Sequence, residues 1–355
     1  MTKHSDYMHW AKTQSRARFN LATSGVGPFP LRELPFDARE LEINGEAPYG
    51  YPPLQGAIAA KCGVSVDHVV AAAGASGANH LAMATLLEPG DEVLIERPSY
   101  ELLVSTAQYV GAAVKRFARR EENGYAVEIA EVRRAMTPRT KLIVLTNLHN
   151  PTSVLTPEPV LRQLGALARE SGARVLVDEV YLDAVYENTP RTAALLGPEF
   201  IVTNSLTKVY GLSGLRCGWI VAEPELARRM WRLNDLFGVI AAHPADLLSV
   251  AAFHALSKIR ERARQVVEAD RAALSEFLAA ESHVAAAHAD FGTTAFLRVV
   301  NGNAETLLQC LRQEYETTVV PGRFFEMPNH FRIGMGVNSE MFAEGLRRIR
   351  MALAS

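Results

Sequence analysis

Residues 204–219 read Asn-Ser-Leu-Thr-Lys-Val-Tyr-Gly-Leu-Ser-Gly-Leu-Arg-Cys-Gly-Trp. Lys208 lies three residues after Ser205 and eight residues before Arg216. A lysine can form a Schiff base, and a hydroxyl and an arginine close to it can bind a phosphate. The stretch therefore predicts a cofactor that carries both an aldehyde and a phosphate, which is the description of pyridoxal phosphate.

Taken alone, this motif is also compatible with other sites. A Ser-x-x-Lys pair occurs in serine β-lactamases and penicillin-binding proteins, where the motifs Ser-Asp-Asn and Lys-Thr-Gly complete the site. Neither of these partner motifs occurs in this chain. A glycine-rich loop with a solvated lysine would have a similar sequence, so the interpretation of the segment depends on the rest of the chain.

Composition favours an enzyme-sized protein with a small-molecule partner. The chain has 355 residues, enough for one large or two ordinary domains. Its 37 basic and 39 acidic residues give a net charge of −2, which does not favour nucleic acid or an anionic membrane. Cys62, Cys217 and Cys310 are too scattered for a disulfide framework or a metal cluster. With a polar N-terminus and no long apolar run, we expect a cytoplasmic protein.

Short apolar runs predict the main sheet. They are separated by segments with helical periodicity, and they cover residues 69–74, 92–96, 141–146, 174–178, 200–204 and 218–222. Continuously apolar strands are typical of a mainly parallel sheet with helices on both faces, an α/β fold. Sites in such sheets lie at the carboxyl ends of the strands.

The two ends of the chain differ from this middle part. Residues 1–45 contain prolines and little periodicity, so we expect an extended arm or an irregular start that contributes part of a small domain. Residues 46–245 form the predicted large cofactor-binding domain. A long helix over 245–280, strands over 294–300 and 331–334 and a helix over 339–353 predict a smaller α+β domain for residues 246–355.

Polar residues after the predicted strands are candidate site residues. Asp178 ends an apolar strand, and a carboxylate there could pair with a pyridinium nitrogen or cap the next helix. Tyr181 follows three residues later and could point to the same ring. Asn150 could donate to a phenolate oxygen, although Asn-Pro is also an ordinary turn pair.

Two further segments could contact the same cofactor. Gly74-Ala75-Ser76-Gly77 lies where a strand meets a helix, and free backbone N–H groups there can bind phosphate. Tyr100 follows another strand and could stack on a cofactor ring, or be an ordinary core aromatic. Each signal alone is modest, but the order of these signals along the chain favours one site.

In this order and spacing the motifs resemble fold-type I pyridoxal-phosphate enzymes, in particular the class I and II aminotransferases, from about Leu21 to the C-terminus. The resemblance implies that Lys208 bonds to the cofactor and moves the proton, and that Asp178 pairs with the pyridine nitrogen. It also implies that Asn150 and Tyr181 contact the phenolate oxygen and that Tyr100 stacks. The implied phosphate ligands are Ala75, Ser76, Ser205 and Arg216.

The resemblance also implies substrate and partner contacts. Arg332 in Phe-Arg-Ile-Gly would bind the substrate α-carboxylate, and a planar guanidinium suits that anion; Arg323 is a weaker candidate. Gly25 would lie on the substrate side. Tyr51, or alternatively Tyr49, would reach the phosphate of a neighbouring subunit, so a C₂ homodimer is expected.

One position departs from the family pattern. The family usually has Asn-Pro-Thr-Gly where this chain has Asn-Pro-Thr-Ser, ending at Ser153. Glycine permits a tight turn there, so the serine puts the loop geometry in question.

The expected activity is amino-group transfer between an amino acid and a 2-oxo acid by a ping-pong mechanism. Alternatives with the same cofactor are a lyase, a decarboxylase or an oxidase, and an alternative of another class is a non-catalytic ligand-binding protein on this fold. The substrate side chain stays open: Arg16, Arg18 and Arg32 are candidate contacts for an acidic group, whereas Phe324 and Phe325 suggest an apolar pocket.

Overall fold

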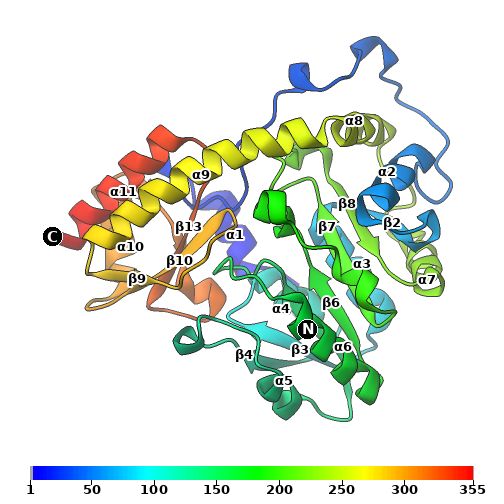
Figure 1. The fold of residues 1–355 in the computed structure, drawn as a ribbon, viewed down its shortest axis with the longest axis horizontal. Coiled ribbons are helices and arrows are strands. Elements are labelled where there is room, and N and C mark those ends of the chain that lie inside the picture. Colours follow the sequence, from blue (N-terminus) through cyan, green and yellow to red (C-terminus); the bar gives the residue numbers. More distant parts are fainter. Residues whose placement is uncertain (1–2, 355) are drawn as a thin grey trace.

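The computed structural model describes residues 3–354, and its centre is a seven-stranded sheet (Figure 1). The strand order is β2-β8-β7-β6-β5-β3-β4. Neighbouring strands are parallel except β8, which runs antiparallel to both β2 and β7. The bounds are β2 (Val69–Ala73), β3 (Glu92–Arg97), β4 (Ala113–Ala118), β5 (Thr140–Thr146), β6 (Arg174–Asp178), β7 (Phe200–Ser205) and β8 (Cys217–Val221). The predicted α/β fold is confirmed.

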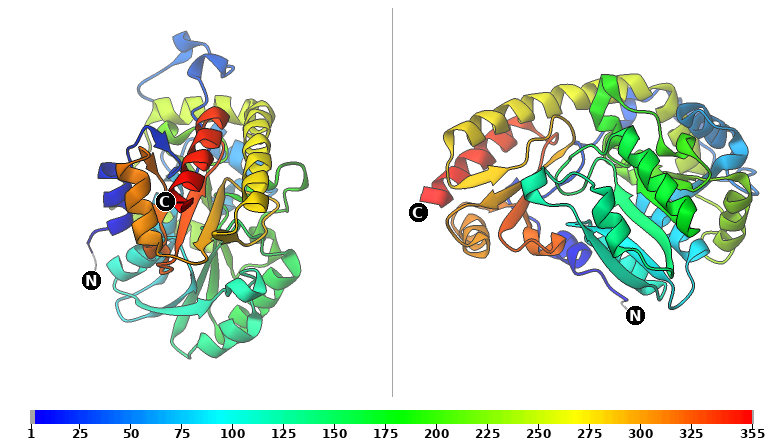
Figure 2. Two further views of the ribbon diagram at one scale, coloured as in Figure 1. Left: turned by 90° about the vertical axis from the view of Figure 1, so that its left-hand side faces the viewer. Right: turned by 60° about the horizontal axis from the view of Figure 1, so that its bottom comes forward.

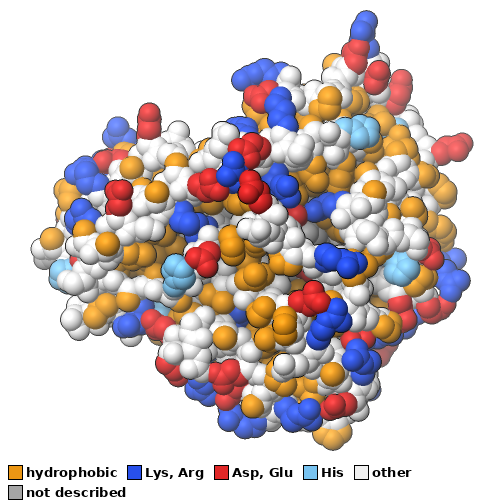
Figure 3. Space-filling view, viewed as in Figure 1, with side chains coloured by type: hydrophobic (Ala, Val, Ile, Leu, Met, Phe, Trp, Pro, Cys, Tyr) orange, Lys and Arg blue, Asp and Glu red, His pale blue; other side chains and the backbone are white. Residues whose placement is uncertain are grey.

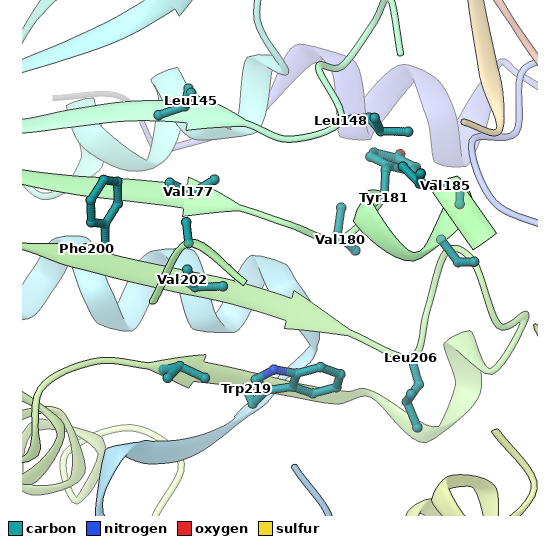
Figure 4. Close-up of a cluster of buried hydrophobic side chains, with 14 of the residues drawn as sticks. Leu145, Leu148, Val177, Val180, Tyr181, Val185, Phe200, Val202, Leu206 and Trp219 are labelled. Carbon is teal, nitrogen blue, oxygen red and sulfur yellow. The ribbon is translucent and has the colours of Figure 1, made fainter. Parts of the chain in front are cut away.

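Helices cover both faces of this sheet, which is why its strands are apolar on both sides. One face packs against α3 (Gly74–Leu86), α4 (Glu101–Tyr109) and α7 (Pro224–Asn234). The other packs against α2 (Pro52–Cys62), α5 (Ile129–Ala135), α6 (Glu158–Ser171) and α8 (His243–His254). Figure 4 shows part of this second core, where Phe200, Val202 and Trp219 project from neighbouring strands.

A smaller sheet lies beside the first (Figure 2). Its four antiparallel strands have the order β12-β13-β10-β9, with bounds β9 (Val284–Ala286), β10 (Thr294–Val299), β12 (Val320–Pro321) and β13 (His330–Gly334). Their core is shared with α9 (Leu256–Ala280), α10 (Ala304–Gln313) and α11 (Ser339–Ala354). In Figure 1 α9 runs from the central sheet to this smaller one. The division of the chain at residues 45 and 245 stays a prediction.

The N-terminal segment is more ordered than the sequence suggested. Residues Asp6–Thr13 form helix α1, and the Ser5 side chain caps it by accepting a bond from Met8 N at 3.1 Å. Further on, β1 (Phe19–Asn20) pairs in parallel with β11 (Thr317–Thr318). The expectation of an irregular start was therefore wrong for these residues, because their partners lie far away in the sequence.

Two other elements differ from expectation. The single helix predicted over 245–280 is two helices, α8 and α9, separated at Ala255. The edge strand β4 was not predicted, because its residues alternate in burial and do not form an apolar run.

Charges of both signs are interspersed over the face drawn in Figure 3. Within residues 3–354, no helix combines the length and apolar character needed to span a membrane.

Candidate active site

A cavity of about 410 Å³ lies at the carboxyl ends of β5 and β6, between the central sheet and the N-terminal segment. This volume is in the range of small-molecule sites, about 300 to 1,000 Å³. Most of the predicted site residues line it, namely Gly25, Ala75, Ser76, Tyr100, Asn150, Asp178, Tyr181, Lys208 and Arg216. Residues up to 191 positions apart in the sequence, from Gly25 to Arg216, therefore meet in one pocket.

Lys208 follows β7 and points into this cavity, where its Nζ donates to Ser24 Oγ at 2.9 Å. Burial lowers the pKa of Lys208, the positive charge of Arg332 adds to this, and Tyr7 and Asp178 oppose it. The backbone of the lysine is equally confined. A Cβ on Gly25 would lie 2.9 Å from the Lys208 carbonyl oxygen, so glycine is required at this crossing.

Asp178 is buried at the end of β6, and burial raises the pKa of its carboxyl. Asn79 Nδ2 donates to Oδ2 at 2.8 Å, and the Val180 N–H donates to Oδ1 at 3.1 Å. Asn79 is in turn fixed by Thr203 Oγ1, which donates to Asn79 Oδ1 at 2.7 Å. The carboxylate is thus held at one orientation, facing the cavity.

The N-terminus of α3 and Arg216 form the anion-binding end of the cavity. Ala75 and Ser76 lie in the first turn of this 13-residue helix, where backbone N–H groups are free to bind a phosphate. Gly74 has φ +71°, and a Cβ on it would lie 2.4 Å from Arg216 Nη2. Arg216 Nη2 itself donates to the Ala73 carbonyl at 3.2 Å. A side chain at position 74 would therefore displace the arginine.

Ser205 does not line the cavity, whereas Thr207, two residues later, does. Thr207 lines the cavity and was not predicted. Ser205 is fully buried, and its hydroxyl contacts Thr207 Oγ1 at 2.7 Å. A direct contact of Ser205 with a phosphate stays a prediction.

Arg332 lies on β13 and is fully buried beside the cavity. Its Nη1 donates to Asn150 Oδ1 at 2.9 Å and its Nη2 donates to Tyr7 Oη at 3.0 Å, while Nε has no partner. Asn150 and Tyr7 both line the cavity, so the guanidinium is directed toward it. By contrast, Arg323 pairs with Glu305 at 3.0 Å on the surface, which favours Arg332 as the carboxylate ligand.

Tyr100 and Tyr181 form aromatic walls of the cavity. Burial raises the pKa of both phenols, so both hydroxyls stay protonated at neutral pH. The Tyr100 ring contacts Tyr7 edge-on, with the ring centroids 5.6 Å apart. A planar ring can therefore be held between α4 and the end of β6.

Tyr51 and Tyr49 lie apart from this cavity. The Tyr51 ring packs edge-on against His243, with centroids 5.1 Å apart, and Tyr49 packs against Trp231 at 6.1 Å. Neither tyrosine lines the cavity of its own chain. Their expected role at a neighbour's site stays a prediction.

Ser153 adopts the backbone conformation that glycine would favour, with φ +64°. Its hydroxyl donates to the Thr294 carbonyl at 2.8 Å, which joins this loop to β10. The serine therefore adds a bond between the loop of Asn150 and the smaller sheet.

Several cavity residues were missed by sequence reasoning, namely Tyr7, Trp10, Ser24, Asn79 and Thr207. Asn79 and Thr207 lie within four residues of predicted positions, so helix and loop spacing could have found them. Tyr7 and Trp10 carry no such signal, because nothing in the sequence links α1 to the strand ends.

Together these groups fit pyridoxal phosphate. The cavity offers a buried amine for the aldehyde, a fixed carboxylate, an amide, and a helix N-terminus with an arginine for the phosphate.

Comparison with known proteins gives the family. Residues 42–349 match the family described as aminotransferase class I and II. Capreomycidine synthase from Streptomyces vinaceus is 29% identical over 353 residues, covering 96% of this chain and 91% of that protein. Aspartate aminotransferase from Streptomyces avermitilis is 27% identical over 331 residues, covering 86% and 80%.

A solved structure agrees with these sequence matches. The crystal structure of a PLP-dependent aminotransferase from Streptococcus suis matches with a TM-score of 0.93 at 27% identity, covering 99% of this chain and 98% of that one. The chain therefore belongs to the class I and II aminotransferases, enzymes of fold type I whose cofactor is pyridoxal phosphate.

Proposed function

We propose that this enzyme transfers an amino group reversibly between an amino acid and a 2-oxo acid by a ping-pong mechanism. The observation that carries the proposal is the position of Lys208, whose amine lies in one cavity with Asp178, Asn150 and the α3 N-terminus. When bound, pyridoxal phosphate supplies an electron sink for the bond that breaks at the substrate Cα.

The roles of the protein groups follow from their positions. Asp178, held by Asn79, would pair with the pyridine nitrogen of the bound cofactor. Arg332 binds the substrate α-carboxylate and so directs the Cα–H bond toward Lys208. Because burial lowers the pKa of Lys208, a larger share of its amine is neutral and able to accept the Cα proton.

Spectra of the half-reaction test this proposal. Holoenzyme mixed with a single amino donor and no oxo acid should change from the aldehyde to the amine form of the cofactor, and an oxo acid should reverse the change. Lys208→Ala should abolish the conversion. Release of pyruvate and ammonia without formation of the amine form would contradict transfer and indicate a lyase.

A second candidate is a different reaction with the same cofactor. The match to capreomycidine synthase covers more of this chain than the match to aspartate aminotransferase, and the former is named a synthase. Elimination, decarboxylation and oxidation all begin at the same Cα. Mass spectrometry of the products from a panel of amino acids separates these reactions from transfer.

We also propose a C₂ homodimer, located in the cytoplasm. The segment around η2 (Ala38–Glu40) projects from the body in Figures 1 and 2, and the side chain of Ile43 in this segment is 78% exposed. Near α7, Leu236 is 76% exposed and Phe237 59%, and neighbouring exposed apolar side chains are candidates for a protein–protein contact. Cys62 and Cys217 are free cysteines, in agreement with a reducing compartment.

The dimer is tested by light scattering. Leu236→Glu together with Phe237→Glu should convert the dimer to a monomer and weaken phosphate binding, because Tyr51 would no longer reach the neighbouring site. Tyr51→Phe should weaken cofactor binding but leave the dimer intact. An active, strictly monomeric wild-type enzyme would contradict the proposal.

A further inference from the structure

We propose that the substrate of this site carries a neutral aromatic or large apolar side chain, which is recognised by helix α1 through Trp10 and Tyr7. The inference rests on the proposed amino-acid substrate and adds the class of its side chain. Both residues line the cavity, and each is only 7% exposed.

The first argument is the aromatic cluster around Tyr7 and Trp10, in which Tyr100 also lines the cavity and Phe324 does not. Tyr7 is the centre of an aromatic cluster: its ring centroid lies 5.6 Å from that of Tyr100, 5.5 Å from Phe324 and 6.4 Å from Trp10. Trp10 and Phe324 are 5.5 Å apart. Aromatic rings packed in this way offer faces and edges to a further ring.

The second argument is charge. Among the described residues that line the cavity, the charged side chains are Asp178, Lys208 and Arg216, and all three face the cofactor. An acidic or basic substrate side chain would therefore meet no opposite charge on the residues of α1 that line the cavity, because Asp6 and Lys12 lie outside it. Burying an unpaired charge is costly, so the wall selects against both kinds of substrate.

The third argument is the connection to the carboxylate site. Tyr7 Oη accepts the bond from Arg332 Nη2, and the Arg332 guanidinium lies 5.1 Å from the centroid of Phe325. One helix thus contacts the arginine that binds the α-carboxylate and also forms the wall next to it. A substrate anchored at Arg332 projects its side chain along α1 toward Trp10.

Two carboxylates without an amino group test the inference apart from any chemistry. 3-Phenylpropanoate carries the side chain of an aromatic substrate, and succinate carries that of an acidic one. In calorimetric titrations of the holoenzyme, 3-phenylpropanoate should bind at least about tenfold more tightly than succinate. Equal affinity, or tighter binding of succinate, would overturn the proposal even without any variant.

Variants assign the preference to its residues. Trp10→Ala should weaken 3-phenylpropanoate about five- to tenfold and leave succinate within about twofold. Tyr7→Phe removes only the hydroxyl beside Arg332, so it should weaken both carboxylates alike. Val66→Ala, an exposed position away from the cavity, is the matched control. Equal loss of both ligands in Trp10→Ala would show a merely structural role and overturn the proposal.

The titrations can be separated from the proposed function by the half-reaction spectra. If phenylalanine converts the cofactor faster than aspartate, both proposals stand. If only aspartate converts it, the inference on the side chain is overturned and amino transfer stands. If no amino acid converts it, amino transfer falls, and the affinities alone decide the side-chain preference.

Discussion

The two sides of the cavity are built in different ways. On the cofactor side, Asp178 ends a buried strand, Lys208 lies three residues after another, and Ala75 lies in the first turn of a helix. On the substrate side, α1 and β13 are brought together from opposite ends of the chain, and Tyr7 meets Arg332 across 325 positions. The groups of the cofactor side can thus be recognised from the strand or helix next to them, whereas those of the substrate side depend on long-range packing.

Rigid support also differs between the two sides. Behind the Asn150 loop, Glu96 Oε1 accepts bonds from Thr146 N and Thr146 Oγ1, both at 2.7 Å, and Thr146 Oγ1 accepts one from Asn150 N at 2.8 Å. Glu96 pairs with Arg119 at 2.8 Å, with both side chains fully buried. On the substrate side, α1 is a helix of eight residues that packs mainly through aromatic rings.

The largest effect should come from the cofactor side itself. Lys208→Ala removes the proposed proton-transfer group and should lower kcat about 10⁴-fold. Single-turnover measurements check this, with Lys115→Ala, exposed on the edge strand, as the control. Retention of more than about a tenth of the activity would mean that the lysine is not the base.

The next effect tests the rigid support. Glu96→Ala leaves Arg119 buried without its partner and should lower the free energy of unfolding by about 3 to 5 kcal/mol. Urea unfolding measures the change. The double variant Glu96→Gln with Arg119→Met should be far less destabilised, because no buried charge is left unpaired. A loss below about 1 kcal/mol in Glu96→Ala would show that the pair is not a support.

A third prediction concerns the pH dependence of the free energy of unfolding, which should differ between a variant of Glu179 and a variant on the substrate side. Burial raises the pKa of Glu179, next to Asp178, from its ordinary value of 4.5 to about 7. Because the pKa is higher in the folded than in the unfolded state, the stability that Glu179 contributes is fully present below pH 4.5. It is lost as the pH rises through about 7.

Urea unfolding of Glu179→Gln measures that contribution. Relative to this variant, the wild type should lose about 2 to 3 kcal/mol of stability between about pH 5 and about pH 8. Tyr7→Phe, on the substrate side, should follow the wild-type pH profile. If the stability of Glu179→Gln ran parallel to that of the wild type over this pH range, the raised pKa of Glu179 would be contradicted.

The smallest effect is expected where the two sides join. Ser153→Gly relieves a left-handed residue but removes the bond to Thr294, and both changes are of the order of 1 kcal/mol. The free energy of unfolding should therefore change by less than about 1 kcal/mol. A larger loss of unfolding free energy would show that the hydrogen bond from Ser153 to Thr294 stabilises the loop more than expected.

The contrast between strand-end groups and long-range contacts also explains what could be predicted from the sequence. The central strands and the groups after them were predictable because a buried parallel strand is continuously apolar and its end faces the site. Two strands of the smaller sheet were predicted, over residues 294–300 and 331–334, whereas the short strands β9 and β12 were not. Helix α1 could not be found, because eight residues give too few turns for periodicity and its partners, Tyr100 and Phe324, are distant. The break at Ala255 was missed because alanine continues a helical pattern equally well.

The segment of residues 26–29, which follows α1 and β1, affects the order in which the protein can fold during its synthesis. Val26 N donates to the Lys208 carbonyl at 2.9 Å, Gly27 N to that of Gly336 at 2.8 Å and Phe29 N to that of Gly211 at 3.1 Å. The segment is translated before all three of its partners, and Gly336 follows Gly27 by 336 − 27 = 309 residues. A nascent chain can thus assemble its central sheet early, but the pocket around Lys208 closes only after Gly336 has emerged.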